Sequence, residues 1–273
     1  MRRFSRVAAV GGTRYQGGPQ RTAERPGFMH QRYLVILGSP RSGTTLLAAM
    51  LGRHPDLAVT NEDKTRAWHN VVGKPVVGVK LCVPNDIEWD ARWRSAVRRR
   101  WRRVALYNRH NLGLPGPRLK VKSIYSIGDL QTWPATQFVG ILRDPHEAVA
   151  SIRERGRHGE GEARFRWTRA VEAMHRLMQE SPDQLAMVDF DRLVTAPEAT
   201  MRGLCARLDV TFEPRVIGGE TPHYHLSGID PAKAGGRGEA RFDHPVFADT
   251  PGLRDKYRAL VEAAAETPEA AAA

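Results

Sequence analysis

Four short apolar runs, separated by longer helix-like stretches, limit the folds that this chain can adopt. The runs lie at residues 33–37, 75–79 and 138–142, with a weaker one at 185–188. Continuous apolar runs of this length are typical of strands buried on both faces of a sheet. The stretches expected to be helical are 45–52, 87–107, 147–153, 163–180 and 197–208. This alternation predicts an α/β fold with a parallel sheet of about five strands and helices on both faces.

The two ends of the chain differ from the rest in composition. Residues 1–30 carry glycines and scattered arginines without a helical or strand period, and we expect them to form a disordered tail. Residues 263–273 are almost all alanine and glutamate, which indicates a frayed C-terminus. The 273-residue chain is long enough for a full core, so residues 31–262 are expected to form a single domain.

A glycine-bearing turn, residues 38–45, follows the first apolar run and leads into a helix. Backbone N–H groups and the helix dipole meet at such a turn, which suits a phosphate group. Gly43 allows close backbone approach, and Thr44 or Thr45 can donate a hydroxyl. The spacing is of the P-loop type, G-x-x-x-x-G-K-[ST], but Thr44 replaces the lysine. Because that lysine contacts the outer phosphates of a nucleoside triphosphate, its absence counts against ATP or GTP.

A second anion-binding element follows the run at 138–142. Arg143 stands at the carboxyl end of this expected strand, and Ser151 lies two turns along the next helix, which opens with Pro145. Ligands of open α/β sheets bind outside the carboxyl ends of the strands. Arg143 and Ser151 are therefore predicted to bind one anion, although Asp144 beside them is also a candidate helix cap.

The segment Pro-Arg-Ser-Gly-Thr-Thr-Leu at residues 40–46 resembles the phosphosulfate loop of sulfotransferases that use 3′-phosphoadenosine 5′-phosphosulfate (PAPS). The resemblance implies transfer of a sulfuryl group to an acceptor hydroxyl, with 3′-phosphoadenosine 5′-phosphate (PAP) as the product. It also implies that Arg143 and Ser151 bind the 3′-phosphate. The residues that it assigns to the 5′-phosphosulfate are Arg41, Ser42, Gly43, Thr44 and Thr45.

Two later segments extend the resemblance. Residues 188–208 are similar to a late sulfotransferase block, in which Phe190 stands where many members have tyrosine. Phe190 is accordingly expected near the adenine, with an ordinary core position as the alternative. Residues 233–238, called the basic loop below, resemble the loop that closes over the 3′-phosphate. Lys233 and Arg237 are its candidate ligands, and a plain surface loop is the alternative.

The catalytic base is assigned through the segment 54–63, which is similar to tyrosylprotein sulfotransferases and their bacterial relatives. The spacing between Arg41 and Glu62 matches that between the loop arginine and the catalytic glutamate of those enzymes. A carboxylate there would take the proton of the attacking hydroxyl. Asp63 is a rival base, whereas His54 in its His-Pro sequence is expected in a structural turn.

Arg41, the loop N–H groups and one lysine are expected to stabilise the transferring sulfuryl group and the charge that develops on the departing phosphate. Lys122 lies where the resemblance places the catalytic lysine and is favoured. Lys80, at the end of the expected strand 75–79, is the alternative. No metal is expected, since His223 and His225 have no carboxylate or cysteine nearby at ligand spacing.

The charge balance favours anionic partners, because 42 lysines and arginines exceed 30 acidic residues and give a net charge of +12. Much of this charge lies in the stretch 87–107, where Trp89, Trp93, Val97 and Trp101 share one helical face among arginines. Buried tryptophans under arginine side chains are one interpretation. The other is a surface that binds an anionic acceptor. Nucleic acid is a third possibility, but no motif for it is present.

The sequence thus predicts a PAPS-dependent sulfotransferase acting on a hydroxyl of a small molecule, glycan, lipid or peptide. The alternatives are a P-loop small-molecule kinase and a non-catalytic basic protein that binds nucleic acid or a membrane surface. No apolar run reaches the roughly 18 residues that span a bilayer. Cys82 and Cys205 are far apart and suggest a reducing compartment, so a cytoplasmic location is expected.

Overall fold

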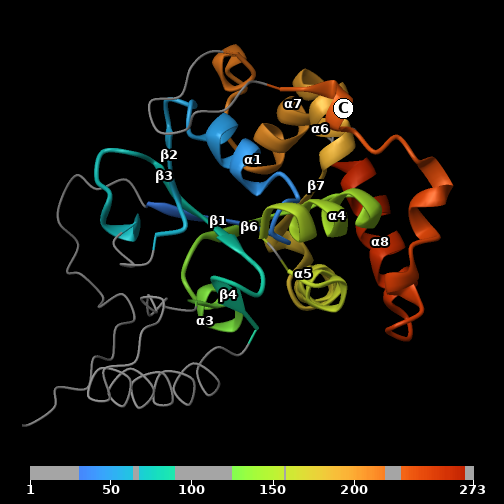
Figure 1. Ribbon diagram of the computed structural model, residues 1–273. Helices are drawn as coiled ribbons and strands as arrows, with labels where there is room; N and C mark the ends of the chain where they lie inside the picture. Colours follow the sequence, from blue (N-terminus) through green and yellow to red (C-terminus); the bar gives the residue numbers. More distant parts are fainter. Residues whose placement is uncertain (1–30, 64–67, 90–124, 157, 219–228, 268–273) are drawn as a thin grey trace, which may run out of the picture.

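A five-stranded parallel sheet forms the centre of the protein (Figure 1). The computed structural model describes residues 31–63, 68–89, 125–156, 158–218 and 229–267. The strands follow the spatial order β2-β3-β1-β6-β7, and every neighbouring pair is parallel. Their bounds are β1 (Arg32–Gly38), β2 (Leu57–Asn61), β3 (Val76–Cys82), β6 (Thr136–Leu142) and β7 (Leu185–Asp189). The predicted α/β class and the strand number are confirmed.

Helices cover both faces of the sheet, because alternate residues of each buried strand point to opposite sides. In β1, Leu34 and Ile36 join one apolar cluster with α1, α6 and α7. Val35 and Leu37 join the other cluster, with α4, α5 and α8. The helices are α1 (Thr44–Leu51), α3 (Ile127–Gln131), α4 (Pro145–Gly156), α5 (Glu160–Glu180), α6 (Phe190–Thr195), α7 (Pro197–Arg207) and α8 (Leu253–Glu266). The prediction of helices on both faces is confirmed.

Strand β2 is the one strand of this sheet that the sequence does not reveal. It lies at the edge beside β3, and only Leu57 of its five residues is buried. An edge strand with mixed burial lacks the continuous apolar run by which the other four strands were predicted. Its position matters because Glu62 follows it directly.

The helix predicted from residue 87 begins differently in the structure. Residues Ile87–Glu88 form a short strand, β4, which pairs in parallel with β5 (Tyr125–Ser126). The carbonyl oxygen of Asp86 accepts a hydrogen bond from the backbone N–H of Tyr125 at 2.7 Å, and this bond stabilises the pairing of the two strands. The prediction of helix at Ile87 is therefore wrong, while residues 90–107 lie outside the described residues.

Trp89 is the first tryptophan of the arginine-rich stretch, and it is buried in the core cluster with the guanidinium of Arg176 over its ring at 4.0 Å. For this residue the core interpretation applies. Trp93, Val97 and Trp101 lie outside the described residues, as do residues 1–30 and 268–273.

Helix α8 continues beyond the domain boundary expected at residue 262. It runs to Glu266 and packs against α5 and β7. Ala264 is buried on this face, so the alanine-rich segment is partly core rather than frayed. No helix in the described part of the chain is both long enough and apolar enough to cross a membrane.

Candidate functional site

The two predicted anion-binding motifs meet at the carboxyl ends of β1 and β6, which are neighbours in the sheet. Arg41 donates from Nε to Oγ of Ser151 at 3.2 Å. Arg143 donates from Nη1 to the carbonyl oxygen of Arg41 at 3.1 Å. Residues that are about a hundred positions apart in the chain thus form one cluster, as ligand sites of open α/β sheets require.

The loop between β1 and α1 has the conformation of a phosphate-binding turn. Arg41 and Gly43 adopt positive φ angles of 71° and 94°, and α1 begins at Thr44. Oγ of Ser42 donates to the carbonyl of Ser39 at 2.8 Å and fixes the turn. Glycine is required at position 43, because an added Cβ would lie 2.3 Å from Cδ2 of Phe190. The backbone N–H groups of the turn are therefore held in a defined arrangement.

Several arginine side chains gather at this site. The pKa of Arg41 is lowered by burial and by the nearby guanidinium groups of Arg155 and Arg143. Burial also lowers the pKa of Arg143, although Glu147 lies 3.8 Å from its Nη2 and opposes that effect. Nε of Arg143 is buried and has no hydrogen-bond partner among the described residues. Such a cluster favours an anionic ligand.

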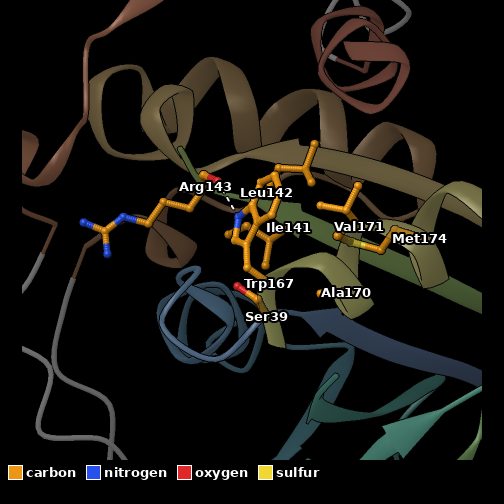
Figure 2. Close-up of a pocket in the computed structure, with 8 residues that line it drawn as sticks. All are labelled: Ser39, Ile141, Leu142, Arg143, Trp167, Ala170, Val171 and Met174. Atoms are coloured by element: carbon orange, nitrogen blue, oxygen red, sulfur yellow. Dashed lines mark hydrogen bonds between the residues drawn. The ribbon is translucent and has the colours of Figure 1, made fainter. Parts of the chain in front are cut away.

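Both the backbone and the side chain of Arg143 make contacts that fix its position. Its carbonyl accepts a hydrogen bond from Nε1 of Trp167 at 3.3 Å, and its side chain extends away from the apolar residues around Trp167 (Figure 2). The guanidinium lies over the ring of Phe190, 4.7 Å from the ring centre. Phe190 is buried, which agrees with the core alternative for this residue. Asp144 caps α4 by accepting from the N–H of His146 at 2.8 Å.

The predicted base lies beside a buried lysine. Glu62 follows β2 with a positive φ of 48°, and its N–H donates to the carbonyl of Lys80 at 2.9 Å. Nζ of Lys80 lies 2.6 Å from Oε1 of Glu62. The lysine side chain is 3% exposed and that of the glutamate 33%, so the glutamate is the more accessible of the two. Burial lowers the pKa of Lys80, but Cys82 and the Glu62 carboxylate outweigh it, and the net shift is upward.

Cys82 connects this ion pair to the phosphate loop, a role that the sequence does not indicate. Its Sγ lies 3.9 Å from Oγ1 of Thr44 and 3.9 Å from Oε1 of Glu62. Burial raises the pKa of the Cys82 thiol. The one available signal is its spacing, since Lys80 and Cys82 share a face of the same strand. Ligand atoms of Glu62, Cys82 and Asp86 lie within 4.8 Å of one another, a grouping in which a cation would compete with the Lys80 ammonium.

The rival bases have structural contacts. Asp63 accepts from the backbone N–H of Trp68 at 2.8 Å through its Oδ2. Both ring nitrogens of His54 contact backbone: Nε2 lies 2.6 Å from the carbonyl oxygen of Thr211, and Nδ1 accepts from the N–H of Asp56. Lys122, the favoured lysine, and the His223 and His225 pair lie outside the described residues.

The basic loop lies against the Arg143 side of the site. Arg143 donates from Nη2 to the carbonyl oxygen of Lys233 at 3.3 Å. The side chain of Lys233 is half exposed, with Nζ 3.6 Å from Asp230. Arg237 lies 3.3 Å from Glu147 and 3.7 Å from the buried Asp144. The loop therefore reaches the predicted 3′-phosphate position, and its two basic side chains contact carboxylates.

Fold and site together define an α/β protein with a P-loop-type turn and a cationic, anion-binding cluster at the carboxyl edge of its sheet. A model of the sulfotransferase family matches residues 34–74 and 90–214, which is more than half of the chain. The chain belongs to the sulfotransferase family.

Curated relatives and solved structures agree with this assignment. The chain is 26% identical over 222 residues to protein-tyrosine sulfotransferase 1 of Danio rerio, covering 74% of this chain and 58% of the relative. It is 25% identical to protein-tyrosine sulfotransferase of Drosophila melanogaster, over 67% of this chain and 39% of that one. The chain thus spans only part of these two relatives.

Among solved structures, the sulfotransferase domain of the Synechococcus PCC 7002 olefin synthase has a similar fold. The TM-score is 0.52 at 15% identity, over 87% of this chain and 98% of that domain. The sulfotransferase domain of the curacin biosynthetic pathway gives a TM-score of 0.50 at 16% identity, over 84% and 98%. At these identities the similarity concerns the fold alone.

Proposed function

We propose that this protein transfers a sulfuryl group from PAPS to an acceptor hydroxyl. The observation that carries the proposal is the meeting of Arg41, Arg143 and Ser151 in one cationic cluster beside the Glu62–Lys80 pair. A kinase would need a lysine at position 44, which is threonine. A donor with phosphate groups at both the 5′ and 3′ positions suits a site in which the loop 41–45 lies next to the Arg143–Ser151 motif.

The donor would bind across the loop and the end of β6. Residues 41–45 hold the 5′-phosphosulfate with backbone N–H groups and hydroxyls. Arg143 and Ser151 hold the 3′-phosphate, with the basic loop alongside. The ring of Phe190 packs against the Arg143 guanidinium and against Gly43. We assign this packing role to Phe190 in place of the expected contact with adenine.

The reaction would proceed by direct transfer. Glu62 accepts the proton of the acceptor hydroxyl as the oxygen attacks sulfur. A new S–O bond forms while the bond from sulfur to the bridging phosphate oxygen breaks, which leaves PAP. Lys80, rather than a metal ion, neutralises the negative charge on that oxygen. The proposal assigns this role to Lys80 instead of Lys122 because Lys80 is buried against Glu62.

For the acceptor we propose a tyrosine hydroxyl in a peptide as the first candidate of the predicted classes. The support is that curated relatives are protein-tyrosine sulfotransferases. A phenolic hydroxyl has a pKa near 10, so a carboxylate base assists its attack. Glycans, lipids and small molecules are the remaining classes for a screen.

A cytoplasmic location is also proposed, and its support is the state of the cysteines. Cys82 and Cys205 are both buried and unpaired. Free thiols persist in reducing compartments.

Titration calorimetry with PAP, ADP and ATP tests the donor assignment. We expect PAP to bind at least tenfold more tightly than either of the other nucleotides, and we expect Arg143→Ala to abolish that preference. A charge-assisted hydrogen bond contributes about 1.5–3 kcal/mol, and a tenfold change in affinity corresponds to about 1.4 kcal/mol. Arg202→Ala is the matched control, because Arg202 is exposed on α7 and pairs with Glu198. Equal or better binding of ATP would favour the kinase. Salt-sensitive binding without nucleotide preference would favour the non-catalytic basic protein.

A further inference from the structure

The basic loop is held in place by a carboxylate that the proposed donor site does not otherwise use. The N–H of Gly235 donates to Oδ1 of Asp191 at 3.0 Å, and the N–H of Gly236 donates to Oδ2 at 3.2 Å. Gly236 has a positive φ of 60°. Two consecutive N–H groups that point at one anion form a nest, and here the anion is a side chain of the protein itself.

Asp191 is itself fixed to the end of β7. It lies in the first turn of α6, where its N–H donates to Oδ1 of Asp189 at 2.8 Å. The preceding residue, Phe190, supports the guanidinium of Arg143. The first turn of α6 therefore carries both the ring under Arg143 and the carboxylate that holds the basic loop.

The loop backbone also packs against a second carboxylate, that of Asp144. A Cβ added to Gly235 would lie 3.1 Å from Oδ2 of Asp144, so its backbone lies directly against that buried carboxylate. Two residues before Gly235, the carbonyl oxygen of Lys233 accepts a hydrogen bond from Arg143 at 3.3 Å. The loop is thus bonded to Asp191 through Gly235 and Gly236 and to Arg143 through Lys233.

We propose that Asp191 is a positioning residue that holds the basic loop against Arg143 in the geometry that binds the 3′-phosphate. This inference rests on the proposed PAPS site. A negative charge beside a phosphate site is unfavourable on electrostatic grounds alone. A positioning role accounts for its presence, since both carboxylate oxygens bind loop N–H groups.

A purely electrostatic role and a positioning role of Asp191 predict opposite changes in PAP affinity for Asp191→Asn. Removing one negative charge near Arg143 should tighten PAP binding if Asp191 acts only through its charge. If Asp191 positions the loop, the asparagine accepts one of the two hydrogen bonds and turns an N–H₂ group toward the other donor. PAP should then bind about tenfold more weakly, as expected for a lost charge-assisted hydrogen bond.

Calorimetry should compare PAP with adenosine 5′-phosphosulfate, which lacks the 3′-phosphate, on the full chain. In Asp191→Asn we expect weaker binding of PAP alone, a raised KM for PAPS and a kcat within about twofold of wild type, because the sulfuryl end is untouched. Asp191→Glu keeps the charge and should restore part of the affinity. Asp183→Asn is the matched control, since Asp183 is exposed and lies before β7, at the other end of that strand from Asp191.

The outcomes distinguish a failure of the positioning role from a failure of the donor assignment. Unchanged or tighter PAP binding by a folded Asp191→Asn overturns the positioning role and leaves the donor site intact. Equal loss for both nucleotides also overturns it, because the effect is then not specific to the 3′-phosphate. A wild-type protein that does not prefer PAP removes the donor assignment and the positioning role with it. If Asp191→Asn fails to fold, Gly235→Ala displaces the loop from the Asp144 side and should give the same selective loss.

Discussion

Nζ of Lys80 lies 2.6 Å from Oε1 of Glu62; Lys80 is in β3, and Glu62 directly follows the neighbouring strand β2. The pairing of β2 with β3 sets this contact, because Asn61 is opposite Lys80 and Glu62 follows Asn61. In the proposed reaction the two side chains have separate tasks, one on the acceptor and one on the leaving group. In that reaction their contact would hold both side chains close to each other at the carboxyl ends of β2 and β3.

Lys80→Met tests the task of the lysine. Methionine keeps most of the side-chain volume but has no charge for the leaving phosphate oxygen. We expect kcat to fall by about 10²- to 10³-fold, the cost of losing one charge-stabilising group, with PAP affinity changed little. Single-turnover assays with PAPS and a tyrosine peptide measure this, and circular dichroism confirms folding.

Lys122→Met is the comparison that separates the two lysines. If Lys80 has the proposed role, kcat of Lys122→Met stays well above that of Lys80→Met. The reverse order of the two variants would return the role to Lys122, the residue favoured by the sequence resemblance.

Glu62→Gln tests the base. Glutamine preserves the shape of the side chain and its contact with Lys80 but cannot take a proton, so we expect kcat to fall by about 10²- to 10⁴-fold while PAP still binds. Asp63→Asn is the matched variant, because Asp63 accepts from the N–H of Trp68, a bond that asparagine can also accept. A larger loss of kcat in Asp63→Asn than in Glu62→Gln would assign the base to Asp63.

The parts of the fold that the sequence predicted are those whose signal is local. Strand β1 is buried on both faces in its central residues, and a buried parallel strand has a continuous apolar run. Arg143 is predictable because it directly follows such a strand, and Ser151 because it lies on the helix that comes next, at the carboxyl end where ligands of α/β sheets bind. Edge strand β2 has no such run and was missed.

The parts that were missed depend on strand order and on distant contacts. The sequence does not show that Lys80 lies beside Glu62, because only the pairing of β2 with β3 brings the two residues together. Asp191 contacts Gly235, which is 44 residues further along the chain, and no spacing in a single sequence reports that pair. Contacts of this kind form during tertiary packing, so they follow from the fold rather than from local propensity.

The packing of Gly43 against Phe190 predicts a strong energetic coupling. Gly43→Ala should lower the free energy of unfolding by more than about 2 kcal/mol, from the positive φ and from a Cβ only 2.3 Å from the ring. Gly73→Ala is the matched control, because Gly73 also has a positive φ but an added Cβ would meet nothing within 4 Å. Urea denaturation should show a clearly smaller loss there.

The double variant Gly43→Ala/Phe190→Ala completes this cycle. Removing the ring relieves the collision, so the combined loss should be smaller than the sum of the single losses by about 1 kcal/mol or more. Additive losses would mean that the ring and the glycine do not constrain each other.

His244 predicts a dependence of stability on pH. Burial, with His146 and Arg164 nearby, lowers the pKa of His244 to about 4 from 6.5. Its Nδ1 accepts from the N–H of Val246, and its ring meets that of His146 edge-on at 4.7 Å. Between pH 6.5 and 4 this histidine is protonated in the unfolded chain but mostly neutral in the folded chain. The free energy of unfolding should therefore fall as the pH decreases from 6.5 toward 4, by on the order of 3 kcal/mol.

His244→Asn isolates this contribution. The asparagine oxygen can accept the N–H of Val246 as Nδ1 does, but the side chain does not titrate. Urea denaturation at pH 7.5, 6, 5 and 4.5 should give a smaller loss of stability in the variant than in the wild type across this window, with nearly constant stability differences above pH 7. Parallel curves for the two proteins would show that folding does not lower the pKa of His244, because a group with equal pKa values in both states contributes no slope.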